Sequence, residues 1–82
     1  MTFGEKVTEL KLHEALCYRI CYFLLENEFD ACAAAEHALL ALYRDEAFWR
    51  ASPDSRPELA KRAATSEALR RKSQMYASFA GA

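Results

Sequence analysis

Residues 10–49 read LKLHEALCYRICYFLLENEFDACAAAEHALLALYRDEAFW, and this stretch decides the fold. It contains two segments in which apolar residues recur with helical periodicity, joined by the short polar break NEFD at residues 27–30. Recurrence of this kind is typical of amphipathic helices. Asn27 is suited to end a helix in the left-handed conformation, and Asp30 is suited to cap the next helix. The stretch therefore predicts an antiparallel helical hairpin, with helices over residues 4–26 and 31–50.

The apolar surface of the first predicted helix is unusually broad. At about 100° per residue, its apolar side chains cover more than half of the circumference. They are Leu10, Leu12, Leu16, Cys17, Ile20, Cys21, Phe23 and Leu24. One neighbouring helix covers much less than this, so the first helix must meet two neighbours or a partner chain. We therefore expect a homodimer that forms through this surface.

The second predicted helix has an apolar face rich in alanine, which permits a close approach to the first helix. That face contains Ala31, Ala35, Ala38, Leu39, Leu42 and Trp49. Leu40 falls on the opposite face, beside Glu36 and Arg44. Isolated exposed leucines are common in proteins, so Leu40 is either an ordinary surface residue or a contact with a partner.

A linker rich in proline and serine, residues 52–58, precedes a third predicted helix over residues 56–79. Its apolar face is thin, and we expect this longer helix to be weakly anchored. The residues on that face are Leu59, Ala63, Leu69, Tyr76 and Ala77. With only two glycines and two prolines in 82 residues, the chain has few turns. The sequence thus predicts a single all-α domain, residues 1–82, built as a three-helix bundle.

Charge divides unevenly along the chain. Residues 1–54 carry five lysines and arginines against ten acids, whereas residues 55–82 carry six against two. Such a division either marks a basic surface for nucleic acid or means that helices of opposite charge attract one another. The candidate phosphate contacts on the third helix are Arg62, Arg70, Arg71 and Lys72.

Cysteine and histidine residues occur in both helices of the hairpin. His13, Cys17 and Cys21 follow one another at intervals of four residues, which spreads them over about 12 Å of helix and keeps them from sharing one ion. We therefore expect free thiols, with no metal and no cofactor. A thiol-based metal or redox sensor that uses Cys17, Cys21 and Cys32 stays as a third alternative. No catalytic motif was found, so we expect that the protein is not an enzyme.

The chain is expected to be cytoplasmic and not to contact a membrane. Glu14, Arg19 and Glu26 interrupt the most apolar segment, so no stretch is long enough to span a bilayer. The first residues lack the basic and then apolar order of a signal peptide.

Three stretches carry a resemblance to a known family: ALCYRICYFLLENEFDA at residues 15–31, ALLALYR at residues 38–44, and the pair Phe48-Trp49. They resemble region 2 of small bacterial RNA polymerase sigma factors. The resemblance covers residues 10–50. It implies that the second helix binds the polymerase clamp and that the following helix contacts promoter DNA. Asp30 and Glu36 keep acidic side chains for the clamp contact, whereas Cys32-Ala33 and Glu36-His37 depart from the acidic and amide pairs usual in the family.

Together these features predict a non-enzymatic regulatory module that binds another protein, with bacterial RNA polymerase as the first partner to test. Asp30, Glu36 and Leu40 would face the protein, and the basic residues of the third helix would face DNA. The alternative is a small self-associating helical protein.

Overall fold

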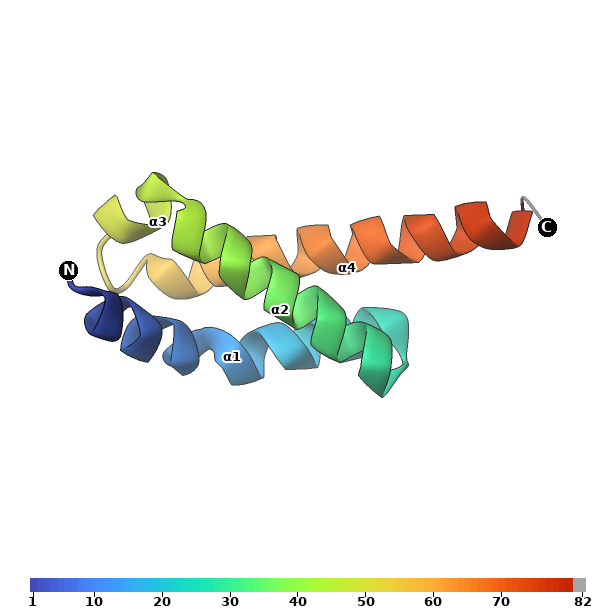
Figure 1. The fold of residues 1–82 in the computed structure, drawn as a ribbon, viewed down its shortest axis with the longest axis horizontal. Coiled ribbons are helices and arrows are strands. Elements are labelled where there is room, and N and C mark those ends of the chain that lie inside the picture. Colours follow the sequence, from blue (N-terminus) through green and yellow to red (C-terminus); the bar gives the residue numbers. More distant parts are fainter. Residues whose placement is uncertain (81–82) are drawn as a thin grey trace.

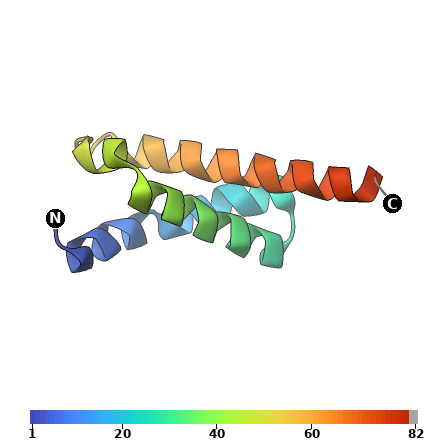
Figure 2. The ribbon, with the colours of Figure 1, turned by 45° about the horizontal axis from the view of Figure 1, so that its top comes forward.

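The computed structural model describes residues 1–80, and every regular element within them is a helix (Figure 1). The helices are α1 (Phe3–Leu25), α2 (Glu28–Arg44), α3 (Glu46–Arg50) and α4 (Arg56–Ala80). The three long helices α1, α2 and α4 each pack against the other two. Helix α2 runs antiparallel to its neighbours, whereas α1 and α4 run in the same direction (Figure 2). The predicted three-helix bundle is confirmed.

The turn between α1 and α2 differs by one residue from the prediction. Glu26 rather than Asn27 adopts the left-handed conformation, with φ at 54°. Asn27 is instead the N-cap of α2, and its Oδ1 accepts a hydrogen bond of 2.9 Å from the backbone N–H of Asp30. Asparagine is among the best N-cap residues, so it takes the capping position and moves the turn back along the chain. Asp30 is thereby released from capping.

The second predicted helix is not continuous to residue 50, which corrects the predicted range 31–50. It ends at Arg44, and Asp45 caps the five-residue helix α3 by accepting a hydrogen bond of 2.9 Å from the N–H of Ala47. An aspartate is more stable at an N-cap than inside a helix because its carboxylate satisfies a free N–H group. The change of direction places Phe48 in the core, where it is fully buried.

Alanine anchors α4 to the bundle. Ala60, Ala64 and Ala68 recur every four residues and are 0% exposed. Leu69 and Tyr76, which the sequence assigned to the apolar face, are exposed instead. Small side chains allow the helix backbones to approach closely, so this contact needs no large residue on α4. Only the last part of α4 fits the expectation of weak anchoring, because the five residues from Ser73 to Ala77 are all exposed.

Helix α4 projects beyond the ends of α1 and α2, which makes the molecule elongated, with extents of 46 × 20 × 20 Å (Figure 1). Within residues 1–80, no helix combines the length and apolar character that crossing a bilayer requires.

Candidate functional site

One side of α1 is apolar but uncovered by the rest of the chain. Leu12 and Phe23 are 71% and 79% exposed, and Leu16 between them is half-buried. At about 100° per residue these three side chains fall within a narrow sector of the helix, together with Glu5 and Arg19. We call these five residues the outer face of α1. The buried residues of α1 lie in the opposite direction, toward α2 and α4; they are His13, Cys17, Cys21 and Leu25.

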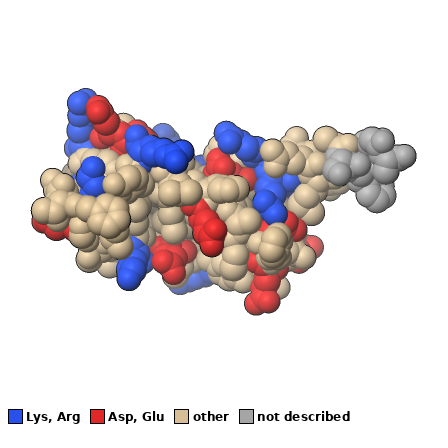
Figure 3. Space-filling model, viewed as in Figure 1, with Lys and Arg blue, Asp and Glu red and all other residues tan. Residues whose placement is uncertain are grey.

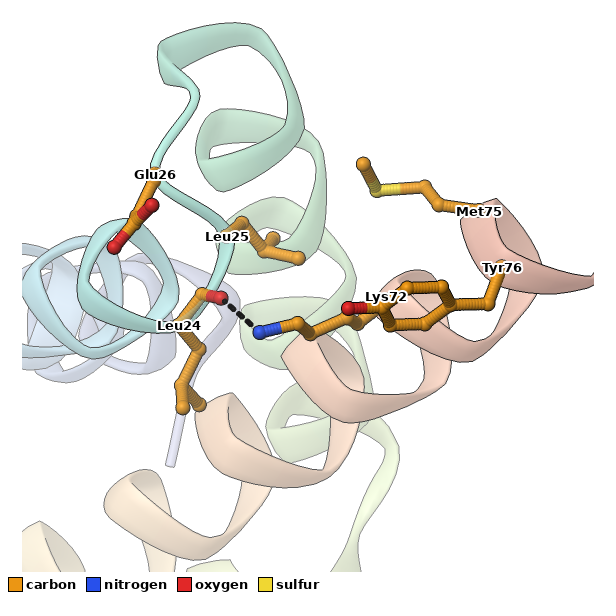
Figure 4. Close-up of a pocket in the computed structure, with 6 residues that line it drawn as sticks. All are labelled: Leu24, Leu25, Glu26, Lys72, Met75 and Tyr76. Atoms are coloured by element: carbon orange, nitrogen blue, oxygen red, sulfur yellow. Dashed lines mark hydrogen bonds between the residues drawn. The ribbon is translucent and has the colours of Figure 1, made fainter. Parts of the chain in front are cut away.

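A second feature is a cleft at the end of the bundle, where α4 projects past the last turn of α1 (Figure 4). Its volume is about 420 Å³, and it is lined by Leu24, Leu25, Glu26, Lys72, Met75 and Tyr76. The Nζ of Lys72 donates a hydrogen bond of 3.1 Å to the carbonyl of Leu24 (Figure 4). This bond satisfies a free carbonyl in the last turn of α1 and places a cation at the negative end of the helix dipole. The lysine therefore helps to join α4 to α1.

The three residues predicted to bind a protein partner lie on α2 but in different surroundings. Asp30 is half-buried, and its Oδ1 accepts a hydrogen bond of 2.8 Å from the Nε of Arg71, whose Nη2 lies 2.7 Å from the same oxygen in an ion pair. Glu36 is exposed, and Leu40 is 49% exposed. Only Glu36 and Leu40 thus have side chains available to a partner without loss of an ion pair within the chain.

The four predicted nucleic-acid contacts are also divided by the fold. Arg71 is bound to Asp30 of α2, and Lys72 is bound to the end of α1. Arg70 is exposed, with its Nη1 3.6 Å from Glu67 Oε2, and Arg62 is exposed. A DNA contact would therefore rest on Arg62 and Arg70 rather than on a cluster of four.

The charge division along the sequence has a structural counterpart inside the bundle. Arg56 of α4 pairs with Glu9 of α1, and Arg71 pairs with Asp30 of α2. Figure 3 shows lysines and arginines interspersed with acids over the visible face, and no charged residue in the described end of α4 that projects from it. These contacts favour the interpretation that helices of opposite charge attract one another.

The buried polar network that joins α1, α3 and α4 has Arg56 at its centre. Arg56 is only 9% exposed; its Nη1 donates to Glu9 Oε1 at 3.0 Å, and its Nε and Nη2 donate to the carbonyls of Phe48 and Trp49 at 3.3 and 3.2 Å. The second Glu9 oxygen, Oε2, lies 2.7 Å from His13 Nε2. Because both carboxylate oxygens already have partners within the chain, we interpret the network as structural. Neither Arg56 nor Glu9 was among the site residues predicted from the sequence.

The three cysteines are free thiols in different surroundings. Cys17 and Cys21 are fully buried, and their Sγ atoms lie 3.8 and 3.6 Å from the carbonyls of Ala60 and Ala64 on α4. Cys32 is exposed on α2. No group of three potential metal ligands occurs in the part of the chain that the structure describes. Burial, and to a smaller extent the neighbouring Cys21, raises the pKa of the Cys17 thiol to about 11, and burial and Glu67 raise the pKa of Cys21. Such thiols are poor nucleophiles, which argues against a sensor that uses Cys17 and Cys21.

These raised pKa values predict a loss of stability in alkaline solution. Thiols of the unfolded chain ionise near pH 8.5 to 9, whereas the buried Cys17 thiol stays protonated until about pH 11. The unfolded state therefore loses its protons first, and the free energy of unfolding should fall as pH rises through this window. For Cys17 alone the loss should approach about 3 kcal/mol. Urea unfolding midpoints measured across the window test this.

The matched control for the alkaline loss is the third cysteine. Cys32→Ala should keep the wild-type slope, because this side chain is exposed, whereas Cys17→Ala should flatten it. Equal slopes in the two variants would contradict the assignment of the loss to Cys17.

No family model matches this chain, and neither a curated protein nor a solved structure matches it.

Proposed function

We propose that this protein is a non-enzymatic helical module that binds another protein through the outer face of α1. The observation that supports this proposal is the exposure of Leu12 and Phe23 on the side of α1 opposite its buried residues. Large apolar side chains that cluster on an exposed helix face are typical of sites for protein partners. Arg19 lies among them, and arginine beside aromatic and aliphatic residues is common in interfaces.

The geometry of the bundle favours this face over the other candidates. It lies on α1, which contacts both α2 and α4, so its side chains are presented by a well-supported helix. The end cleft is lined partly by the projecting end of α4, and Lys72 there is already hydrogen-bonded to Leu24. Binding at the outer face of α1 would break none of the hydrogen bonds or ion pairs described above.

Binding to bacterial RNA polymerase is the second proposal, and it rests on the resemblance to sigma region 2. Glu36 and Leu40 support it because they are exposed together on α2. The engagement of Asp30 with Arg71 weakens it, since a clamp contact through Asp30 would compete with that ion pair. A promoter contact would fall to Arg62 and Arg70.

Site-specific photo-cross-linking in the native host tests the two proposals against each other. A cross-linking amino acid at position 12 or 23 reports on the outer face of α1, position 40 reports on the sigma-like surface, and position 50 in α3 serves as an exposed control. We expect one discrete adduct from positions 12 and 23, and none from position 50. An adduct with polymerase from position 40 alone would instead support the sigma-like interaction.

Binding measurements with purified components then give the contribution of the outer face to the binding free energy. Leu12→Ser combined with Phe23→Ser should weaken binding to the cross-linked partner at least about thirtyfold, because central apolar anchors dominate interface energies. The doubly substituted chain should keep its helical content, since neither side chain is in the core. Absence of a discrete adduct at both positions 12 and 23 would refute the proposed site.

A further inference from the structure

The outer face of α1 has a seven-residue repeat of charge and apolar character. Glu5, Leu12 and Arg19 lie seven residues apart and are all exposed. Because seven residues are close to two helical turns, the three side chains lie nearly on one line along α1. Leu12 is therefore at the midpoint between an acid and a base, about 10 Å from each along the helix axis. This order is complementary to itself when a second copy runs in the opposite direction.

An antiparallel pair of α1 helices with Leu12 on the two-fold axis places residue i of one copy opposite residue 24 minus i of the other. Arg19 then faces the partner's Glu5, and the same pair recurs on the other side of the axis, as isologous symmetry requires. Leu12 meets the partner's Leu12, and Leu16 lies opposite the partner's Thr8. Phe23 lies just beyond the start of the partner's α1, next to the exposed residues that precede it. Leu12 and Leu16 thus meet apolar or uncharged residues.

Other registers are less favourable. An antiparallel pair with Leu12 opposite the partner's Phe23 places Arg19 opposite the partner's Leu16, and a pair centred on Leu16 places Arg19 opposite the partner's His13, which is buried. Neither register pairs Arg19 with Glu5. A parallel pair brings Arg19 against the partner's Arg19, and like charges in contact destabilise it.

The charged groups of the face are available for such contacts. The carboxylate of Glu5 accepts a hydrogen bond of 2.9 Å from the N–H of Thr2 through Oε1, which leaves Oε2 for a partner. Hydrogen bonds from Thr2 also lower the pKa of Glu5, so the carboxylate is ionised at neutral pH. No ion pair within the described chain involves Arg19.

From this complementarity we infer that the partner seated on the outer face of α1 is a second copy of this chain, packed antiparallel with Leu12 at the two-fold axis and Arg19 paired with the partner's Glu5. The inference rests on the proposed function, because it names the occupant of the same surface. The exposed apolar side chains of both copies are then buried together, which is how a domain of only 82 residues gains additional burial.

Charge-reversal variants of the full chain test the proposed register. Sedimentation equilibrium measures the dimer dissociation constant of each variant. We expect the wild type to be a dimer. Arg19→Glu alone, and Glu5→Lys alone, should each raise the dimer dissociation constant roughly tenfold, because each replaces two attractive pairs by two repulsive ones. The combined Glu5→Lys and Arg19→Glu variant should recover most of the wild-type affinity. Leu12→Glu should leave monomers, since it places two carboxylates on the axis.

The controls separate loss of contact from loss of fold. Arg44→Glu is a matched reversal on α2, outside the outer face, and should leave the dimer intact. Glu5→Gln keeps an acceptor for the capping hydrogen bond and should weaken the dimer less than Glu5→Lys. Circular dichroism confirms that each variant is helical.

Three results would overturn the inference. They are a wild-type monomer at all concentrations, a dimer unaffected by the single reversals, and reversals that the combined variant does not rescue. A monomer that still forms an adduct with a different protein from position 12 would overturn the second copy as occupant and leave the proposed function standing. A monomer with no adduct would remove both.

Discussion

Replacing Arg56 with methionine should lower the free energy of unfolding by about 3 to 5 kcal/mol. Methionine keeps the length and much of the apolar volume of the arginine stem but removes the guanidinium. The Glu9 carboxylate would then lose its cation, and the carbonyls of Phe48 and Trp49 would lose their donor. Breaking a buried ion pair by removing one partner is costly because the other charge stays buried and uncompensated.

The effect of Arg56→Met should be visible as a large shift of the unfolding transition to lower urea concentration. A domain of this length has a total stability of roughly 4 to 12 kcal/mol, so the loss consumes a large part of it. Urea unfolding followed by circular dichroism measures the change. The matched control is Arg62→Met on the same helix, which should change the stability by less than about 0.5 kcal/mol because Arg62 is exposed.

A double variant identifies the source of the loss. Glu9→Gln removes the carboxylate charge but keeps an oxygen for His13, so combining it with Arg56→Met should be less destabilising than Arg56→Met alone. The two residues share a hydrogen bond, and their effects should therefore not add. A loss of less than about 1 kcal/mol for Arg56→Met would mean that the network contributes little to the stability of the fold.

The sequence predicted the parts of this fold that depend on local periodicity. The amphipathic pattern of residues 10–49 was sufficient to predict the hairpin, and Leu40 is exposed as its position in the pattern indicated. The capping box at Thr2 and Glu5 is local in the same sense, because it joins residues only three positions apart, and it provides acceptors for two free N–H groups at the start of α1.

The contacts that join distant elements could not be predicted in this way. Arg56 and Glu9 are 47 residues apart, and Arg71 and Asp30 are 41 apart. Each residue alone resembles an ordinary surface charge, because its burial depends on how α4 packs against α1 and α2. The only available signal was the charge division along the chain, which indicated attraction between helices without identifying the pairs.

The anchoring of α4 was missed for a different reason. Ala60, Ala64 and Ala68 are spaced as one helix face, but alanine is common on exposed and buried surfaces alike, so their spacing carried little weight beside the larger Leu59, Leu69 and Tyr76. The alanines of α4 are buried because small side chains lie opposite them on α1. The Sγ atoms of Cys17 and Cys21 on α1 lie next to the carbonyls of Ala60 and Ala64 on α4. The candidate surface on α1 was indicated by the width of its apolar arc. The packing of α2 and α4 against α1 determines which part of that arc stays exposed.

Phe48→Ala is the second substitution with a large expected effect, a loss of about 3 to 5 kcal/mol in the free energy of unfolding. Phe48 is fully buried, and its ring packs edge-on against Trp49 and His13, with centroids 4.8 and 5.7 Å away. The Arg56 guanidinium carbon lies 5.8 Å from its centroid. Truncation leaves a cavity beside the polar network, so the loss of apolar burial is accompanied by weaker positioning of Arg56.

Thermal and urea unfolding of three variants separate these contributions. Phe48→Leu keeps most of the apolar volume and should cost about 1 to 2 kcal/mol, well below the alanine variant. Phe29→Ala is the exposed control; its ring contacts the Arg71 guanidinium from the surface, and its removal should cost no more than about 1 kcal/mol. Equal losses for Phe48→Ala and Phe29→Ala would contradict the burial of Phe48. The variant that combines Phe48→Ala with Arg56→Met tests whether the two side chains act together. A loss of unfolding free energy smaller than the sum of the two single losses would mean that the ring and the guanidinium hold α3 in the bundle jointly. Each substitution alone then already weakens the contact that the other side chain provides.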